Sequence, residues 1–279
     1  MTPTQAIYLV NVLICAILAL LMTNYWRRSG RERSLGTFMA SAWVLLAADI
    51  LFYLRDDLVY WAGRFFPTLL VTIGQVILLI GARRVVGRSD AAKRAVALVA
   101  MHALALALFL VYLGGISAFR TVLNGLLWAA LSIAAAVVLR RAEDPDVREA
   151  MGVAALIFVL HASFHLLRTT FAILTLTEIG SGTPEWLQIA GDMEVSGFMV
   201  GLFLALLVGY AQLHGARLLK AERELRELTT LLPICAWCKN VRSDEGYWQR
   251  LEDYFESRGN VRVTHGMCDS CSQKALEQE

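Results

Sequence analysis

Four of the five cysteines stand in two closely spaced pairs near the C-terminus. The pairs are Cys235-Ala-Trp-Cys238 and Cys268-Asp-Ser-Cys271, and residues 239–267 separate them. A Cys-x-x-Cys turn can aim two sulfurs at one point, and two such turns complete a tetrahedral site with no open position. We therefore predict one structural zinc ion per chain. Iron bound by the same thiolates and a redox-active dithiol pair are the alternatives.

A second group of polar residues lies inside strongly apolar sequence. His161, His165 and Arg168 follow one another at helical spacing and share one face of a helix. The carboxylates within other apolar stretches are Asp49, Asp192 and Glu194. Counting the helical rise from the ends of these stretches places His165, Arg168 and the three carboxylates at similar depth. We therefore expect these groups, with His161, to meet in one pocket in the outer half of a membrane.

Three interpretations of this pocket remain open. It is a structural cluster of ion pairs and hydrogen bonds, a sensor site for a small ligand, a proton or a metal, or a site for haem or a redox metal such as copper. Two histidines at i and i+4, as in His161 and His165, can share one metal ion. They cannot bind both faces of one haem, so haem ligation requires His102 or a second subunit. His102 is more typical of a hydrogen-bonded core histidine.

Seven apolar stretches are long enough to hold these residues in a bilayer, whose core of roughly 30 Å needs about 20 helical residues. The stretches are 6–25, 35–54, 66–81, 95–113, 121–139, 150–176 and 189–213. Arg64 and Pro67 interrupt the start of the third stretch, which is expected to extend toward Leu58. The sequence therefore predicts an all-α polytopic membrane protein with seven transmembrane helices.

Composition and charge agree with this fold class. Hydrophobic residues make up 57% of the chain, charged residues 18%, and the mean hydropathy is +0.54, whereas a soluble domain carries about 25% charged residues. These values argue against a soluble single-domain enzyme and against a disordered chain. The net charge of +2 gives no sign of nucleic-acid binding. Cys15, the fifth cysteine, lies alone in the first stretch and is interpreted as inert packing.

The basic residues of the connecting loops are unevenly distributed. Loops after the first, third and fifth stretches carry most of them, within 27–33, 83–94 and 140–148. The opposite loops carry only Arg55, Arg64 and Arg120. The positive-inside rule places the richer loops in the cytoplasm. We therefore expect the N-terminus outside and the C-terminal tail in the cytoplasm, where thiols stay reduced.

The seventh stretch continues into a charged helix with an apolar stripe. Gly197-x-x-x-Gly201 is a small-residue pattern that lets helices approach closely. Leucines at a and d heptad spacing follow, with charged residues on the other faces. These leucines are Leu218, Leu225, Leu228 and Leu232. We predict a coiled-coil connector over residues 214–232 and a parallel homodimer. The alternative is an amphipathic helix that folds onto its own chain.

Residues 233–279 are expected to form a small α+β module that depends on metal binding for its folding. Asp244 is expected to cap a helix that runs to about Ser257. The apolar face of that helix is predicted to consist of Tyr247, Trp248, Leu251, Tyr254 and Phe255. Residues 261–264 predict a short strand, and a last helix is expected near the second cysteine pair. His265 is expected to hydrogen-bond a metal-bound sulfur rather than bind the ion.

The tail also carries a longer motif around its cysteines. The motif consists of Leu231-Leu232-Pro233-Ile234-Cys235, Cys238-Lys239, Val241-Arg242, Gly246-Tyr247-Trp248, His265-Gly266, Cys268 and Cys271. Through this motif, residues 229–275 resemble a short module of bacterial signalling proteins. That module follows PAS, GAF or receiver domains, often after a coiled coil. Asp269-Ser270 stand where that family often has a proline. Residues 1–213 more loosely resemble the seven-helix sensor regions of bacterial histidine kinases and cyclases.

The resemblance implies a sensor or signalling adaptor of the bacterial inner membrane, whose tail contacts a kinase or response regulator supplied in trans. It implies a membrane domain (1–213), a connector (214–232) and a zinc-binding module (233–279). The alternatives are a haem- or copper-binding redox or metal-handling protein that uses His161 and His165, and a transporter, against which stands the lack of an internal repeat. No nucleophile–base arrangement is recognisable in the sequence, so we do not expect an enzyme.

Overall fold

Seven helices of the structure are long and apolar enough to cross a membrane, and the chain is an all-α multi-pass membrane protein. The computed structural model describes residues 3–55, 57–88, 92–112, 117–177, 185–229, 233–243, 246–257, 264 and 266–276. The chain divides into two compact units, Met1–Ala216 and Arg217–Glu279, close to the predicted boundary after residue 213.

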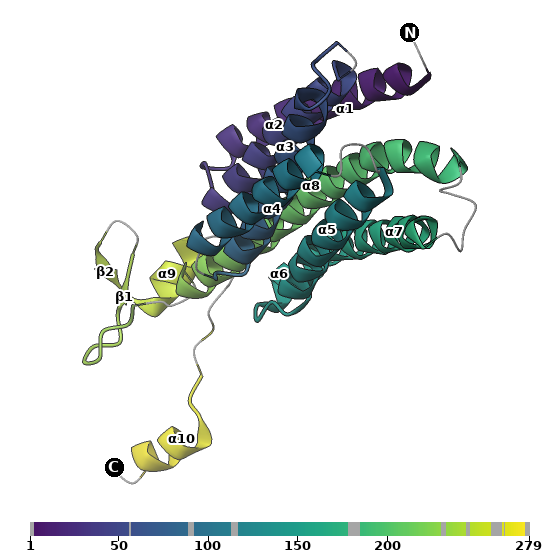
Figure 1. The fold of residues 1–279 in the computed structure, drawn as a ribbon. Coiled ribbons are helices and arrows are strands. Elements are labelled where there is room, and N and C mark those ends of the chain that lie inside the picture. Colours follow the sequence, from purple (N-terminus) through teal and green to yellow (C-terminus); the bar gives the residue numbers. More distant parts are fainter. Residues whose placement is uncertain are drawn as a thin grey trace. The chain divides into compact units, whose positions relative to one another are not determined.

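Each predicted apolar stretch lies in one long helix, and the bounds differ by a few residues except at the end of α8, which runs well beyond residue 213. Figure 1 shows these helices. They are α1 (Pro3–Arg28), α2 (Arg33–Tyr53), α3 (Ala62–Val85), α4 (Ala92–Tyr112), α5 (Ser117–Arg140), α7 (Gly152–Leu176) and α8 (Glu185–Thr229). Because α3 begins at Ala62, Arg64 and Pro67 lie within it and do not interrupt its start. The seventh stretch continues into the connector without a break, as predicted, since α8 runs to Thr229.

A short helix, α6 (Pro145–Ala150), precedes α7. The Asp144 side chain caps it by accepting the backbone N–H of Asp146 at 2.9 Å, and Pro145 occupies the first turn, where its missing N–H is not needed. Met151 then adopts φ −95° and ψ 5° between the two helices. The predicted stretch 150–176 therefore corresponds to α7, and only its first residue, Ala150, belongs to α6.

Neighbouring helices of the membrane unit pack in an ordered series. Helix α2 contacts α1 and α3, α3 also contacts α4 and α5, and α5 contacts α7. Side chains of α8 reach three of these helices. Ser196 hydrogen-bonds Asn11 of α1, the Phe198 ring meets Phe158 of α7 at a centroid distance of 5.9 Å, and Tyr210 contacts Phe38 of α2. Helix α8 therefore lies against both halves of the unit.

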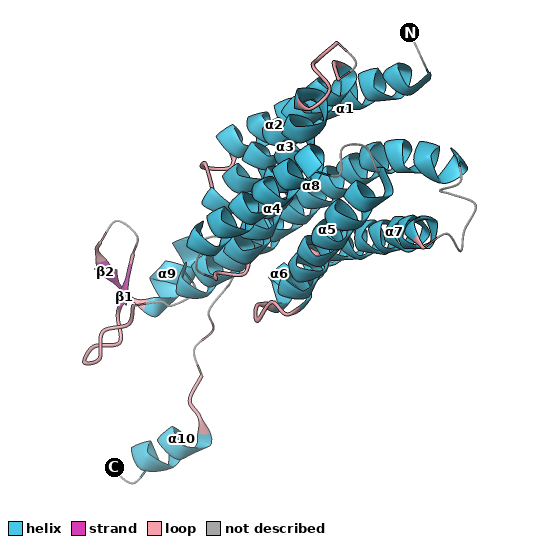
Figure 2. Cartoon of the chain, viewed as in Figure 1, coloured by secondary structure: helices cyan, strands magenta, loops and turns pink. Residues whose placement is uncertain are grey.

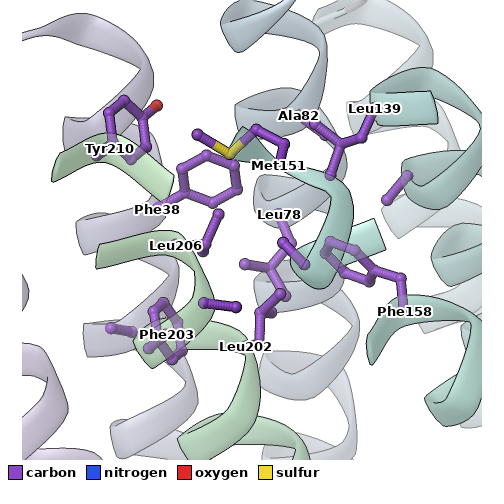
Figure 3. Packing of buried hydrophobic residues seen from close by; sticks show 14 of the residues in the cluster. Phe38, Leu78, Ala82, Leu139, Met151, Phe158, Leu202, Phe203, Leu206 and Tyr210 are labelled. Atoms are coloured by element: carbon purple, nitrogen blue, oxygen red, sulfur yellow. The ribbon is translucent and has the colours of Figure 1, made fainter. Parts of the chain in front are cut away.

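The apolar core lies where α2, α3, α5, α7 and α8 meet (Figure 3). Its central side chains are Phe38, Leu78, Leu139, Met151, Phe158, Leu202, Phe203, Leu206 and Tyr210. Lipid tails are as apolar as these side chains, so the contacts stabilise the bundle mainly through van der Waals packing. Glycines permit the close approach of α2 and α3, because a Cβ at Gly74 would lie 2.6 Å from Leu45 and one at Gly81 would lie 2.7 Å from the Phe38 ring.

The second unit carries the only strands in the described part of the chain (Figure 2). They are β1 (Val241–Arg242) and β2 (Trp248–Gln249), which pair antiparallel with Val241 opposite Gln249. Two short helices follow, α9 (Leu251–Ser257) and α10 (Asp269–Leu276). Helix α10 confirms the helix predicted near the second cysteine pair.

The start predicted for the first tail helix is wrong. Trp248 lies on β2, and Tyr247 belongs to the turn before it, where its C=O accepts the N–H of Ser243 at 2.8 Å. Gly246 supplies the left-handed backbone of that turn, with φ 91°. The helix begins only at Leu251, and it ends at Ser257 as predicted. Asp244 and residues 261–263 lie outside the described residues, and Thr264 is not in a strand.

Candidate functional site

His161 of α7 is the centre of a buried polar cluster. Its Nδ1 lies 2.6 Å from Glu194 Oε1 on α8, and its Nε2 lies 2.9 Å from Gln75 Nε2 on α3. A neutral imidazole satisfies both contacts when it donates from Nδ1 to the carboxylate and accepts from the amide N–H at Nε2. Three helices are therefore joined through one ring.

His165 lies one helical turn from His161 and completes the cluster. The two rings meet edge to face, with centroids 4.5 Å apart and an interplanar angle of 84°. One nitrogen of each ring and a Glu194 oxygen all lie within 4.8 Å of one another. Among the residues that the structure describes, these form the only group of three potential metal ligands, and the four tail cysteines do not form another.

Two oxygens of this cluster are buried without a hydrogen-bond partner in the described part of the chain. They are Gln75 Oε1 and Glu194 Oε2. Both are acceptor atoms, and buried acceptors are rarely left unpaired in folded proteins. The cluster therefore has unused capacity for a cation or for a hydrogen-bond donor.

Aromatic rings fix the two imidazoles in place. Phe198 of α8 stacks on His161 at a centroid distance of 3.7 Å and an angle of 16°. The ring of Trp128, on α5, meets His165 edge to face at 5.3 Å. These contacts restrict rotation of both imidazole rings, so their nitrogens are held in a defined direction.

Arg168 lies beside α8, near the cluster that was predicted to contain it. A Cβ added to Gly191 would lie 2.7 Å from Arg168 Nη1, so glycine allows the guanidinium to approach the helix backbone. Gly191 precedes Glu194 by one turn of α8. Asp192 was also predicted to join the pocket, but its side chain lies outside the described part of the structure.

Asp49 was predicted to join the histidines, but its side chain binds elsewhere. Its Oδ2 accepts a hydrogen bond from Cys15 Sγ at 2.9 Å, and both residues are buried between α1 and α2. Cys15 is fully buried in the apolar core, as packing requires, and in addition donates this hydrogen bond. Similar depth in the membrane did not bring Asp49 to the pocket, because its side chain faces α1.

His102 has a hydrogen-bond partner at each ring nitrogen. Nδ1 lies 3.1 Å from Thr72 Oγ1, and Nε2 lies 3.0 Å from Asn124 Oδ1. The side chain is buried. This environment matches the hydrogen-bonded core histidine that the sequence predicts.

Sequence reasoning missed two polar residues. Gln75 stands inside the apolar stretch 66–81, so the signal that identified the histidines was present for it as well. His214 near the end of the membrane unit contacts Glu32 Oε2 at 3.1 Å and the Tyr25 hydroxyl at 3.3 Å. Nothing in the local sequence indicates these partners, because they lie far away along the chain.

The first cysteine pair lies in a tight turn. The Cys235 N–H donates to Asn240 O at 2.8 Å, and Lys239, with φ 61°, donates its N–H to Cys235 O at 3.0 Å. The backbone N–H groups of Cys238 and Trp237 point at Cys235 Sγ and, with the Cys238 thiol, lower the pKa of Cys235. Such bonds favour the thiolate, which is the form that binds a metal.

The second cysteine pair lies at the start of α10. Ser270 Oγ lies 3.3 Å from Cys268 Sγ, and this contact, followed by the backbone N–H and thiol of Cys271, lowers the pKa of Cys268 to about 7. Both pairs are therefore preformed two-sulfur turns, which fit the donor set of zinc. Binding of one ion by both turns remains a prediction. His265 lies outside the described residues.

The small-residue motif of α8 faces partly toward its own chain. A Cβ at Gly201 would lie 3.4 Å from Ile157 of α7, whereas a Cβ at Gly197 would have nothing within 4 Å. A groove of about 780 Å³ between α7 and α8 includes Gly201. Farther along α8, Leu218 and Leu225 are 72% and 62% exposed. The Leu228 side chain and Leu232 lie outside the described part of the chain.

Comparisons with protein-family models, with curated proteins and with solved structures give no match to this chain. Its function therefore has to be inferred from the residues and their geometry.

Proposed function

We propose that this chain is a sensor or signalling adaptor of the bacterial inner membrane, in which α8 couples the buried histidine–glutamate cluster to the cysteine-rich tail. The continuity of α8 carries this proposal. Glu194, bonded to His161, and Leu225, beyond the membrane unit, lie on one uninterrupted helix. Roughly 45 Å of helix separates them at 1.5 Å per residue.

The chemistry of the cluster supports a sensing role. Glu194 and His161 join α8 to α7 through one short contact of 2.6 Å. A proton or a cation that binds there changes the charge of the contact in a medium of low dielectric constant, where the energetic effect is large. A stimulus acts as a signal only when it binds two conformations with different affinity. Displacement of α8 against α7 provides the second conformation in this proposal.

The tail serves in this proposal as an interaction module. A zinc ion held by Cys235, Cys238, Cys268 and Cys271 has no open coordination position, so its role is to stabilise the fold rather than to catalyse a reaction. The partner is a cytoplasmic kinase or response regulator supplied in trans. Pairing of the exposed Leu218 and Leu225 stripes makes the sensor a parallel homodimer.

A second candidate is a membrane protein that handles a transition metal. The close grouping of His161, His165 and Glu194 ligand atoms favours it. The two candidates predict different effects of a change in the cluster, since only the sensor requires a response at the far end of α8.

Hydrogen–deuterium exchange of the full-length protein in lipid nanodiscs tests the sensor. We expect Glu194→Gln to change amide exchange at least twofold in peptides from residues 217–229 and 251–257, because the α7–α8 contact changes. Peptides from α5 serve as an internal reference, since general destabilisation accelerates their exchange too. Asp57→Asn, the same chemical change at an exposed loop position, is the matched control.

Unchanged exchange beyond Ala216 in Glu194→Gln would reject the coupling. The same holds for a change that Asp57→Asn reproduces, or for one that extends equally to α5.

A further inference from the structure

We propose that His161, His165 and Glu194 bind a divalent transition-metal ion such as Zn²⁺ or Cu²⁺, with Gln75 available as a fourth ligand. This inference rests on the proposed function only where it names a transition metal as the ligand to which the sensor responds. The binding itself does not depend on signalling. None of these residues belongs to the cysteine-rich tail.

The spacing of the donor atoms is close to that of a metal site. Zinc lies about 2.0–2.1 Å from imidazole nitrogen, so two ligand atoms of one ion are separated by at most about 4.2 Å. The three ligand atoms lie within 4.8 Å of one another, and Glu194 Oε1 is already 2.6 Å from His161 Nδ1. Both histidines sit on adjacent turns of one helix, which fixes their separation.

The donor set selects the type of ion. Ca²⁺ takes six to eight oxygen ligands and Mg²⁺ retains water, so neither suits two imidazoles. Imidazole together with a carboxylate suits zinc, copper, iron and nickel. A dication neutralises the buried carboxylate of Glu194 and gives a partner to Glu194 Oε2 and Gln75 Oε1, which have none among the described residues.

The surroundings of the cluster favour binding over a purely structural role. Stacking of Phe198 on His161 and the edge contact of Trp128 with His165 hold the two rings in place. Preorganised ligands lose little side-chain freedom when the ion binds. The Glu194 side chain is 16% exposed and that of His161 4%. The Glu194 side chain is thus the more exposed part of the site, although its Oε2 is buried, and the two imidazoles form the interior.

The test uses full-length protein in detergent that carries Cys235→Ser and Cys268→Ser, which removes one thiolate from each cysteine pair and so breaks the tail site. Equilibrium dialysis against Zn²⁺ and Co²⁺ is followed by elemental analysis. We expect one bound ion per chain and a Co²⁺ spectrum without sulfur charge-transfer bands. His165→Gln and Glu194→Gln in this background each weaken binding more than tenfold. His214→Gln, a histidine outside the cluster, leaves binding unchanged.

Circular dichroism and gel filtration establish that each variant is helical and monodisperse. The double variant His161→Gln/His165→Gln gives the background level of metal binding. If the protein with the intact cluster binds no more Zn²⁺ and Co²⁺ than this variant, the proposed metal site is overturned, even if the cluster binds protons. Added Zn²⁺ that binds at the cluster without altering exchange in residues 217–229 would leave the metal site standing and reject the sensor. If Glu194→Gln alters exchange in residues 217–229 but the cluster binds no metal, the metal site is rejected and the sensor stands.

Discussion

At the scale of single residues, His161 is the point at which α3, α7 and α8 meet. Its two nitrogens contact Gln75 and Glu194, and its ring stacks on Phe198. Hydrogen bonds between membrane helices contribute on average only about 0.6 kcal/mol each, because the unfolded chain in the membrane also finds partners. The contribution of His161 is therefore mainly to orientation, and only modestly to stability.

Removing the acceptor of His161 is expected to destabilise the membrane unit. Glu194→Ala leaves the His161 Nδ1–H buried without its partner, at a cost of about 1 kcal/mol. Glu194→Gln retains an oxygen that can accept the bond, so its effect is smaller. The measurement is the temperature of half-maximal aggregation of detergent-solubilised protein. Equal losses in the two variants, or none in Glu194→Ala, would contradict the hydrogen bond.

Residue spacing predicted part of the candidate site, for physical reasons. His161 and His165 share a face because four residues make about one helical turn, and polar groups in apolar helices face the interior. Depth along a helix says nothing about the direction of a side chain around it. The sequence therefore could not separate Glu194, which reaches His161, from Asp49, which faces Cys15.

At the scale of elements, α8 is held closely against the junction of α6 and α7. A Cβ at Gly209 would overlap the carbonyl oxygen of Ala150, which is backbone and cannot rotate away. Nothing lies within 4 Å of a Cβ at Gly215, six positions farther along the same helix. The position of α8 thus depends on one glycine.

Gly209→Ala is expected to lower stability by roughly 1–3 kcal/mol through overpacking, although alanine favours the helix itself. Gly215→Ala keeps the gain in helix propensity and adds no clash, so it is the matched control. Thermal aggregation in detergent measures both. A stabilised Gly209→Ala would show that α8 can move away from Ala150 at no cost.

The exposed stripe of α8 makes a dimer testable. A photo-crosslinking amino acid at position 218 or 225 is expected to give a covalent dimer on illumination in native membranes, because both side chains face outward. The same amino acid at Leu104, 62% exposed on α4, is expected to give none. Failure at both connector positions, with crosslinking to other proteins intact, would favour a helix that packs on its own chain.

The long helices of the membrane unit could be predicted to within a few residues, except at the end of α8, whereas the start of the first tail helix could not. Long apolar stretches admit one structure in a bilayer, because every backbone polar group must be bonded within the segment. Tyr247 and Trp248 fitted the spacing of a helical face, but the left-handed turn at Gly246 and the pairing of Trp248 with Arg242 place them before the helix. Turn geometry of this kind is set by pairing between strands, which periodicity does not reveal.

At the scale of the whole molecule, charge and hydropathy divide the chain. Basic residues gather in 27–33, 83–94 and 140–148, on one side of the predicted membrane topology, and the same side receives the tail. The lowered pKa values of Cys235 and Cys268 keep a larger share of these thiols ionised, which a reducing compartment preserves for metal binding. The predicted topology would thus keep these thiols in the form that binds a metal.

Reporter fusions are expected to confirm this orientation. Green fluorescent protein fused after Glu279 should fluoresce, and alkaline phosphatase at the same point should be inactive, since the tail is predicted to be cytoplasmic. Alkaline phosphatase in the loop that contains Asp57 should be active. Activity of the phosphatase after Glu279 would reverse the topology and remove the tail from the reducing compartment.

The continuity of α8 also determines the direction in which its later residues point around the helix axis. Each residue inserted between Leu213 and Leu218 turns everything beyond it by about 100° and advances it by about 1.5 Å, because the helix is continuous through this point. Seven inserted residues return the downstream surface to within about 20° of its original azimuth. Single-residue insertions should therefore change the direction in which Leu225 points around the axis of α8, and seven-residue insertions should restore it.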